Sequence, residues 1–205
     1  MVGQANAWLR RLPVWPLYPL GLLPAVWLFW LALTGGLGPD PVKALEHRYG
    51  ETALQLLIAG LAVSPLRRFA GLSLLRFRRA LGLLAFSWLV LHLLVWAVLD
   101  VQLDLRVMWE DVAKRPYLTL GMAGFLLLVP LALTSTDRAM RRMGPVAWRR
   151  LHLLVYPAAL LAGLHQLLAA KVWEPASLAY AGVILLLLAL RLPLSGLARR
   201  RPHRA

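Results

Sequence analysis

Six apolar runs constrain the fold of this 205-residue chain more than any other feature. A transmembrane helix needs about 20 predominantly apolar residues, and only helices and closed barrels satisfy their own backbone within hydrocarbon. The runs cover residues 14–34, 52–66, 80–99, 117–134, 146–170 and 177–192. We therefore predict an all-α polytopic membrane bundle with six transmembrane helices, which forms a single integral membrane domain over residues 1–205.

The second run, 52–66, has the weakest signal because it is short and ends at Ser64-Pro65. A segment of this kind either crosses the bilayer with a tilt or enters it only in part. The sequence leaves both alternatives open, and the six-span topology depends on which of them holds.

The formal net charge of +14 follows the connections between the runs. Arginines gather before the first run, between the second and third, between the fourth and fifth, and after the sixth. The other connections hold most of the acids, among them Asp40, Glu46, Asp100, Asp104, Glu110 and Asp111. By the positive-inside rule both termini are predicted to be cytoplasmic. Because the charge is explained as a topological signal, we expect no nucleic-acid partner.

Three histidines, His92, His152 and His165, lie inside the apolar runs. An imidazole in hydrocarbon costs free energy unless it has a partner, so each is a candidate functional residue. Cysteine is absent, which leaves histidine as the strongest candidate ligand for a transition metal.

The helix rise of about 1.5 Å per residue assigns these histidines to two depths. His92 and His165 fall at a similar level in the periplasmic half, on different helices, whereas His152 lies about 20 Å nearer the cytoplasm. Two imidazoles from separate helices at one depth match the axial ligation of a b-type haem iron. We predict that His92 and His165 form such a ligand pair.

The role of His152 stays open between several alternatives. It lies about 140° from His165 around an ideal helix, although a kink at Pro157 would reduce that mismatch. Either one haem binds at the level of His92 and His152 has another role, such as an interfacial hydrogen bond, or His152 holds a second haem. The sequence does not choose between one and two haems.

Residues near these histidines carry less specific signals. Trp88 and Trp96 lie four residues before and after His92, so they either line the face of a macrocycle or fill the bundle, and we favour packing. Gly121 and Gly124 permit either close helix approach or space for a planar ligand. None of these patterns predicts a site by itself.

A haem-free transporter or membrane assembly scaffold is the competing class of function. Proton-coupled and cation transporters usually place acidic groups in mid-membrane. No Asp or Glu falls in the core of any predicted span. We therefore favour electron transfer through haem, with no catalytic residue supplied by the chain itself.

Five segments resemble, in the same order, those of the MsrQ family, formerly called YedZ. They are GGLGPDPV (35–42), RALGLLAFSWLVLHLL (79–94), RPYLTLG (115–121), LALTST (131–136) and WRRLHLLVYPAALLAGLH (148–165). The resemblance covers nearly the whole chain. It implies a ferric-reductase-like haem-binding core, related to that of NADPH oxidases, with His92, His152 and His165 at the positions of the family's haem histidines.

The same resemblance implies a function. Such proteins are haem-binding subunits of the bacterial inner membrane that pass electrons from the quinone pool to MsrP, a periplasmic molybdenum-cofactor enzyme that reduces methionine sulfoxide in oxidised proteins. FMN is implied as a further cofactor. Because the sequence shows no flavin or nicotinamide domain, we expect electrons from a quinol or from a separate flavin reductase at the cytoplasmic face. The acidic segments 35–51 and 100–116 are the expected docking sites for MsrP in a heterodimer.

Overall fold

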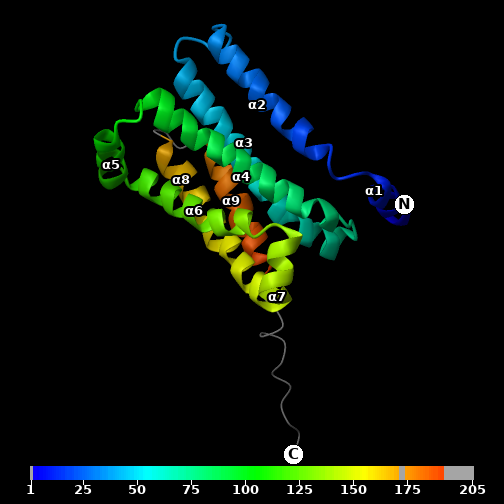
Figure 1. Cartoon of the computed structure of the whole chain (residues 1–205). Coiled ribbons are helices and arrows are strands. Elements are labelled where there is room, and N and C mark those ends of the chain that lie inside the picture. The colour runs from blue at the N-terminus through cyan, green and yellow to red at the C-terminus, as the bar shows by residue number, and fades with distance from the viewer. Residues whose placement is uncertain (1, 171–173, 192–205) are drawn as a thin grey trace, which may run out of the picture.

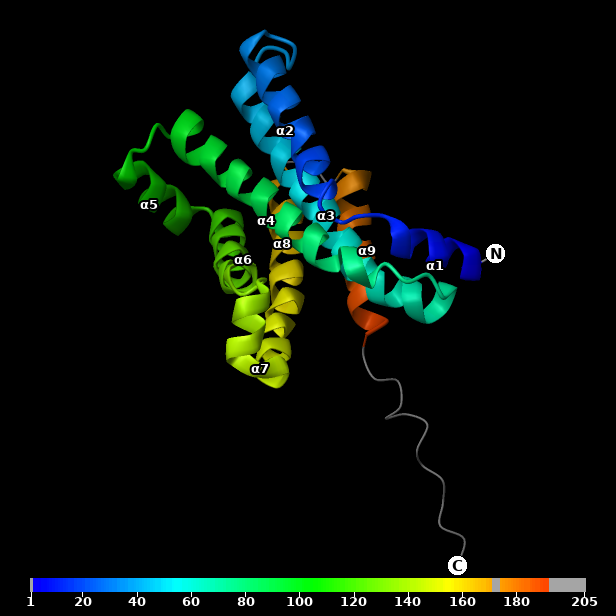
Figure 2. The same ribbon diagram turned by 45° about the vertical axis from the view of Figure 1, so that its right-hand side comes forward.

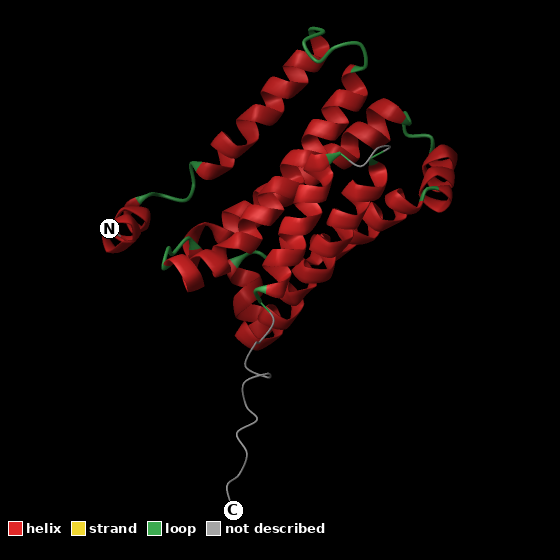
Figure 3. Ribbon diagram, turned by 180° about the vertical axis from the view of Figure 1, so that it is seen from behind, coloured by secondary structure: helices red, strands yellow, loops and turns green. Residues whose placement is uncertain are grey.

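The computed structural model describes residues 2–170 and 174–191, and within them every regular element is helical (Figure 3). The α-helices are α1 (Val2–Arg11), α2 (Leu17–Leu33), α3 (Pro41–Ala70), α4 (Arg78–Leu94), α5 (Leu105–Lys114), α6 (Pro116–Leu133), α7 (Asp137–Leu151), α8 (Val155–Ala169) and α9 (Pro175–Ala189). Short 3₁₀ segments occupy Leu75–Phe77 and His152–Leu154, and a π-helical segment occupies Val95–Asp100. The predicted all-α class is confirmed.

Four continuous helical stretches in the described residues are long and apolar enough to cross a membrane: Pro41–Ala70, Leu75–Asp100, Pro116–Leu133 and Asp137–Ala169. Helices α2 and α9 are also apolar, but they have 17 and 15 residues. A helix of 17 residues is about 25 Å long, less than the hydrocarbon thickness of about 30 Å. A multi-pass membrane bundle is thus supported, whereas the six-span count stays a prediction. Leu192, the predicted end of the sixth span, and the arginines from 199 onward lie outside the described residues.

The second apolar run is the middle of α3, a continuous helix of 30 residues with no break at Ser64-Pro65. The Asp40 side chain accepts a hydrogen bond from the Lys43 N–H and caps the first turn. The helix ends at Gly71, whose φ of 68° is left-handed. Because both ends of α3 are polar, hydropathy identified only its central turns.

Two helix pairs form the body of the molecule (Figures 1 and 2). Helix α3 packs against α4, and α6 packs against α8, with α9 beside α8 and α2 on the outer side of α3 and α4. One apolar core joins the pairs, with Leu57 and Leu61 from α3, Ala85 from α4, Ala159 from α8 and Ile184 from α9.

The connections gather at opposite ends of the bundle according to their charge. At one end Arg79 and Asp137 form an ion pair of 2.6 Å, and the Arg76 side chain donates to the Leu9 carbonyl at the end of α1. At the other end Lys43 pairs with Asp100 at 2.6 Å. This segregation agrees with the charge pattern from which cytoplasmic termini were predicted, and the orientation itself stays a prediction.

Helix α2 is held against the bundle by two buried aromatic side chains. The Tyr49 hydroxyl donates to the Ala25 carbonyl at 2.7 Å, and the Trp88 indole donates to the Gly21 carbonyl at 2.9 Å. The two rings meet edge to face with centroids 5.2 Å apart. Because α2 has few buried residues of its own, these contacts carry much of its attachment.

Replacing Trp88 with alanine should therefore destabilise the bundle. Trp88 is 1% exposed, so Trp88→Ala leaves a large cavity and removes the indole hydrogen bond to Gly21, and we expect the free energy of unfolding in detergent to fall by about 3–5 kcal/mol. The control is Trp109→Ala, because Trp109 is 75% exposed and its loss should change stability by less than about 0.5 kcal/mol. Equal stability of the two variants would contradict this account.

Candidate functional site

A cavity of ≈ 640 Å³ lies between the two helix pairs, in the half of the bundle near α5. Its walls come from α3, α4, α6 and α8 and are mostly apolar, with side chains that include Leu57, Leu89, Phe125 and Leu128. The volume is within the range of about 300–1,000 Å³ that is typical of cofactor and small-molecule sites. The cavity can therefore hold a large apolar group.

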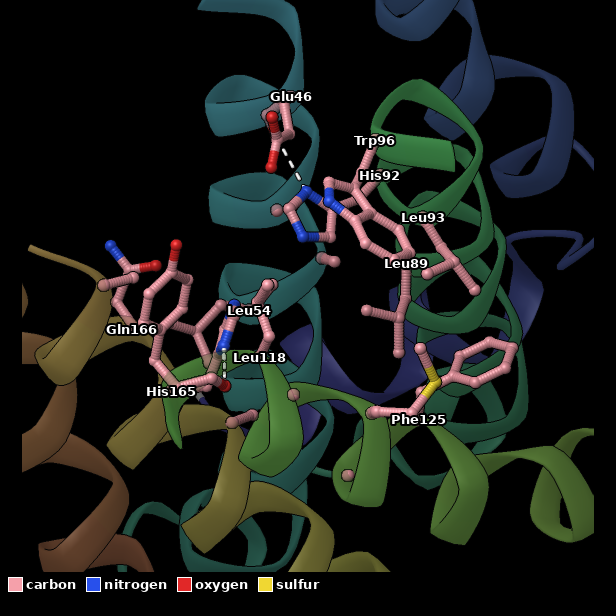
Figure 4. Close-up of a pocket in the computed structure, with 18 of the residues that line it drawn as sticks. Glu46, Leu54, Leu89, His92, Leu93, Trp96, Leu118, Phe125, His165 and Gln166 are labelled. Carbon is pink, nitrogen blue, oxygen red and sulfur yellow. Dashed lines mark hydrogen bonds between the residues drawn. The ribbon is translucent and has the colours of Figure 1, made fainter. Parts of the chain in front are cut away.

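His92 and His165 enter this cavity from α4 and α8 (Figure 4). Their ring centroids are 6.3 Å apart, and the ring planes are inclined by 73°. The structure thus brings together the two histidines that helix rise placed at one depth.

Each of these rings has a hydrogen bond to the backbone of a neighbouring helix. His92 Nδ1 lies 2.8 Å from the Glu46 carbonyl oxygen in α3, and His165 Nδ1 lies 2.7 Å from the Tyr117 carbonyl oxygen in α6. A carbonyl only accepts, so each Nδ1 carries the proton and donates it. The Nε2 lone pairs are left available, and these nitrogens face each other across the cavity (Figure 4).

This geometry fits a metal ion shared by the two rings. A metal ion lies roughly 2 Å from an imidazole nitrogen and about 3 Å from the ring centre, so two rings on opposite sides of one ion have centroids about 6 Å apart. The observed 6.3 Å matches that spacing. Hydrogen bonds from the outer ring nitrogens, as seen here, are the usual support for metal-binding histidines.

The remaining ligands of such an ion are not offered by the protein. Among the described residues there is no group of three or more His, Cys, Asp or Glu side chains that could hold a metal ion. A haem iron needs only two axial ligands from the protein, because its macrocycle supplies the other four nitrogens. Two facing imidazoles in a large apolar cavity fit that requirement.

Polar side chains lie at one edge of the cavity. Lys43, His47 and Gln166 line it there, and the Lys43 ammonium group is already bound to Glu46 at 3.1 Å and to Asp100 at 2.6 Å. The change from apolar walls to charged groups marks this edge as the one nearest to water.

His152 lies apart from the other two histidines and does not line the cavity. Its Nδ1 lies 3.0 Å from the Trp148 carbonyl oxygen of the preceding turn, and its ring stacks on Trp148 with centroids 3.8 Å apart. Its Nε2 is buried and has no hydrogen-bond partner among the described residues. His152 therefore lies in an environment separate from that of the paired histidines. In the described part of the chain no second imidazole faces it.

The expected kink at Pro157 corresponds to an irregularity of the backbone in the turn before this proline. The backbone tightens to a 3₁₀ turn at His152–Leu154, and Pro157 is the third residue of α8. A proline ring clashes with the carbonyl four residues before it, here that of Leu153, which is within the 3₁₀ turn. A second break lies at Gly144, whose φ is 76°.

The two tryptophans beside His92 have different roles. Trp88 is the packing residue described above, in agreement with the expectation, whereas Trp96 lines the cavity. Trp96 lies in the π-helical segment that follows α4 at Val95, and such segments often occur at functional sites. Gly121 and Gly124 also line the cavity.

Helix α5 covers one side of the cavity. Val112 lines the cavity from α5, and the Thr119 hydroxyl donates to the Val112 carbonyl at 2.6 Å. On α5, hydrogen bonds from Lys114 and then Arg106 lower the pKa of the partly exposed Glu110 carboxyl. Within the predicted docking segment 100–116, the carboxylate of Glu110 is therefore already paired within its own helix.

The Thr119 hydrogen bond should control how firmly α5 covers the cavity. Thr119→Val removes the donor with little change of shape, and we expect about fivefold faster amide hydrogen exchange in α5, since such a bond contributes about 1 kcal/mol. Thr52→Val is the matched control, because the Thr52 hydroxyl bonds only to the Arg48 carbonyl of its own helix. Unchanged exchange in Thr119→Val would show that other contacts hold α5 in place.

Sequence reasoning missed the two carbonyl groups that orient the histidines, those of Glu46 and Tyr117. Because these are backbone atoms, the identity of a residue does not show that its carbonyl group takes part. The only available signal was that a buried imidazole needs a partner, without an indication of which one.

Comparisons with known proteins agree with this arrangement. Residues 49–163 match the family described as ferric reductase like transmembrane component. A Brucella ovis protein named protein-methionine-sulfoxide reductase heme-binding subunit MsrQ is 45% identical over 189 residues, which cover 92% of this chain and 86% of that protein. Proteins of the same name from Brucella anthropi and Brucella canis are 43% and 45% identical over the same length. No solved structure matches the chain.

Proposed function

The chain belongs to the MsrQ family, within the ferric-reductase-like transmembrane group, and we propose that it is a b-type haem electron-transfer subunit of the bacterial inner membrane. The observation that carries this proposal is the facing pair of imidazoles, with centroids 6.3 Å apart. Sequence similarity over 92% of the chain to proteins named as haem-binding subunits supports it independently.

When bound, a haem supplies a carrier for single electrons, which no side chain of this protein provides. His92 and His165 would hold the iron through Nε2, and the Glu46 and Tyr117 carbonyls keep both rings in the required tautomer and orientation. The apolar walls exclude water from the site, which favours electron transfer over side reactions with solvent.

The wider role we propose follows from membership of the family. Electrons enter from the quinone pool, or from a flavin reductase that docks on the arginine-rich connections, and leave to the periplasmic molybdoenzyme MsrP for the repair of methionine sulfoxide in oxidised proteins. The exit side would be the end of the bundle that holds α5 and Lys43, because the cavity lies in that half. The two proteins would form a heterodimer there.

FMN, also implied by the family resemblance, does not fit the cavity described here. A flavin phosphate requires a set of backbone N–H groups or cations, whereas the walls are apolar and Lys43, the cation that lines the cavity among the described residues, is already paired with two carboxylates. We therefore propose no role for FMN at this site.

Loss of either paired imidazole should remove the haem. We expect His92→Ala and His165→Ala each to lose most of the bound haem, measured as the ratio of haem to purified protein from reduced-minus-oxidised spectra. The control is His47→Ala, which removes an imidazole at the edge of the same cavity and should keep a wild-type ratio. A wild-type haem content in either paired variant would contradict the assignment.

The same spectra test the competing hypothesis that the protein is a transporter or an assembly scaffold without haem. A wild-type protein that is folded in membranes supplied with haem, yet shows no haem absorption, would favour a haem-free transporter or assembly scaffold. The absence of carboxylates facing the cavity walls, other than Glu46 at its edge, argues against a proton-coupled or cation transport site among the described residues.

The haem content of a His152→Ala variant distinguishes a protein that binds one haem from a protein that binds two. If the protein holds a single haem at the paired histidines, His152→Ala should leave the haem ratio unchanged, since His152 lies outside that cavity. If it holds a second haem, the ratio should fall from about two to one. We expect the first result, because the described residues place no second imidazole opposite His152, and a measured ratio near two in the wild type would overturn that expectation.

A further inference from the structure

Both carbonyls that bind the paired histidines lie four residues before a glycine. In α3 the carbonyl is that of Glu46 and the glycine is Gly50, and in α6 they are Tyr117 and Gly121. We propose that Gly50 and Gly121 are positioning residues, which uncover these carbonyls so that the histidine rings can bind them. This inference rests on the proposed haem-binding function and assigns two further residues to it.

Helix geometry explains why a glycine at that spacing favours this contact. Each Cα–Cβ bond in an α-helix tilts toward the N-terminus, so a side chain covers the turn before its own Cα. The residue at position i+4 therefore shields the carbonyl of residue i from its side of the helix. That carbonyl already accepts the helical N–H of residue i+4, and a ring that approaches the second lone pair over residue i+4 comes closest when no Cβ is present there.

The distances support this explanation at both positions. A Cβ built on Gly50 would lie 3.0 Å from His92 Nδ1 and 3.1 Å from Cε1 of the same ring. A Cβ built on Gly121 would lie 2.8 Å from His165 Nδ1 and 3.0 Å from its Cε1. In each case the atom that would be displaced is the one that donates the hydrogen bond, so an alanine would push the ring away from its carbonyl.

The arrangement occurs twice, once in each helix pair, and it differs from that of other glycines. Gly60 in α3 would place a Cβ 4.0 Å from Leu81, an ordinary contact, and Gly82 in α4 has no atom within 4 Å. Neither of them lines the cavity. Close approach to an imidazole is thus specific to Gly50 and Gly121 among these four residues.

Displacement of a ring should change the properties of a bound haem. An Nδ1–H that donates to a carbonyl makes the imidazole a stronger electron donor to the metal, and mutation of such outer partners typically weakens metal binding about 10–100-fold. When the imidazole donates less electron density, the ferric state of the iron loses more stabilisation than the ferrous state does. We therefore expect the midpoint potential to move to a more positive value when either hydrogen bond is lost.

The experiment compares Gly50→Ala and Gly121→Ala with Gly60→Ala and Gly82→Ala in the full-length protein. Haem affinity is measured by titration of haem into the purified protein, and the midpoint potential by spectroelectrochemistry. We expect about tenfold to hundredfold weaker haem binding and a more positive potential in the first two variants, with wild-type values in the two controls. If the wild type itself binds no haem, the proposed function fails. If the wild type binds haem and all four variants behave alike, the positioning role is wrong.

A double-mutant cycle tests the same contact without haem. Gly121→Ala should lower the melting temperature of the haem-free protein when His165 is present, and should not lower it in a His165→Ala background, where the ring that it displaces is absent. The corresponding cycle joins Gly50→Ala with His92→Ala. If Gly121→Ala is equally destabilising, or equally poorly folded, in both backgrounds, the inference is overturned.

Discussion

The need of a buried imidazole for a hydrogen-bond partner is the constraint on which the site depends. In a membrane helix most carbonyls already accept a backbone N–H, and these two histidines use the second lone pair of a carbonyl on a neighbouring helix. His92 does so on α3 and His165 on α6. Each bond ties the two helices of a pair together, and the two pairs then present their remaining nitrogens to a common space. The same two contacts thus join the helices within each pair and orient the imidazoles of the site.

The parts of this arrangement that sequence could predict depend on fixed dimensions. A constant rise per residue is enough to place His92 and His165 at one depth and His152 at another, and the alternation of arginines and acids divides the connections between two ends. The all-helical class follows from the apolar runs. Each of these inferences needs only distances along one helix or the charge of one loop.

The parts that sequence could not predict depend on contacts between helices or on local changes of the helix. The full length of α3 was hidden because capping by Asp40 and the polar first turns extend it beyond the apolar window. Trp88 and Trp96 have the same spacing from His92, yet Trp88 is buried against α2 whereas Trp96, in the π-helical segment, lines the cavity. The roles of Gly50 and Gly121 become visible only when the neighbouring ring is placed against them.

If the proposed haem binds between the two imidazoles, the 73° between their planes would affect the electronic state of its ferric ion. Parallel axial rings would separate the energies of the two d orbitals that lie perpendicular to the macrocycle, because both rings interact with the same one. Nearly crossed rings interact with both, and leave them close in energy. The magnetic anisotropy of the oxidised protein would then be fixed by which two carbonyls hold the rings, and hence by the crossing of α3 with α4 and of α6 with α8.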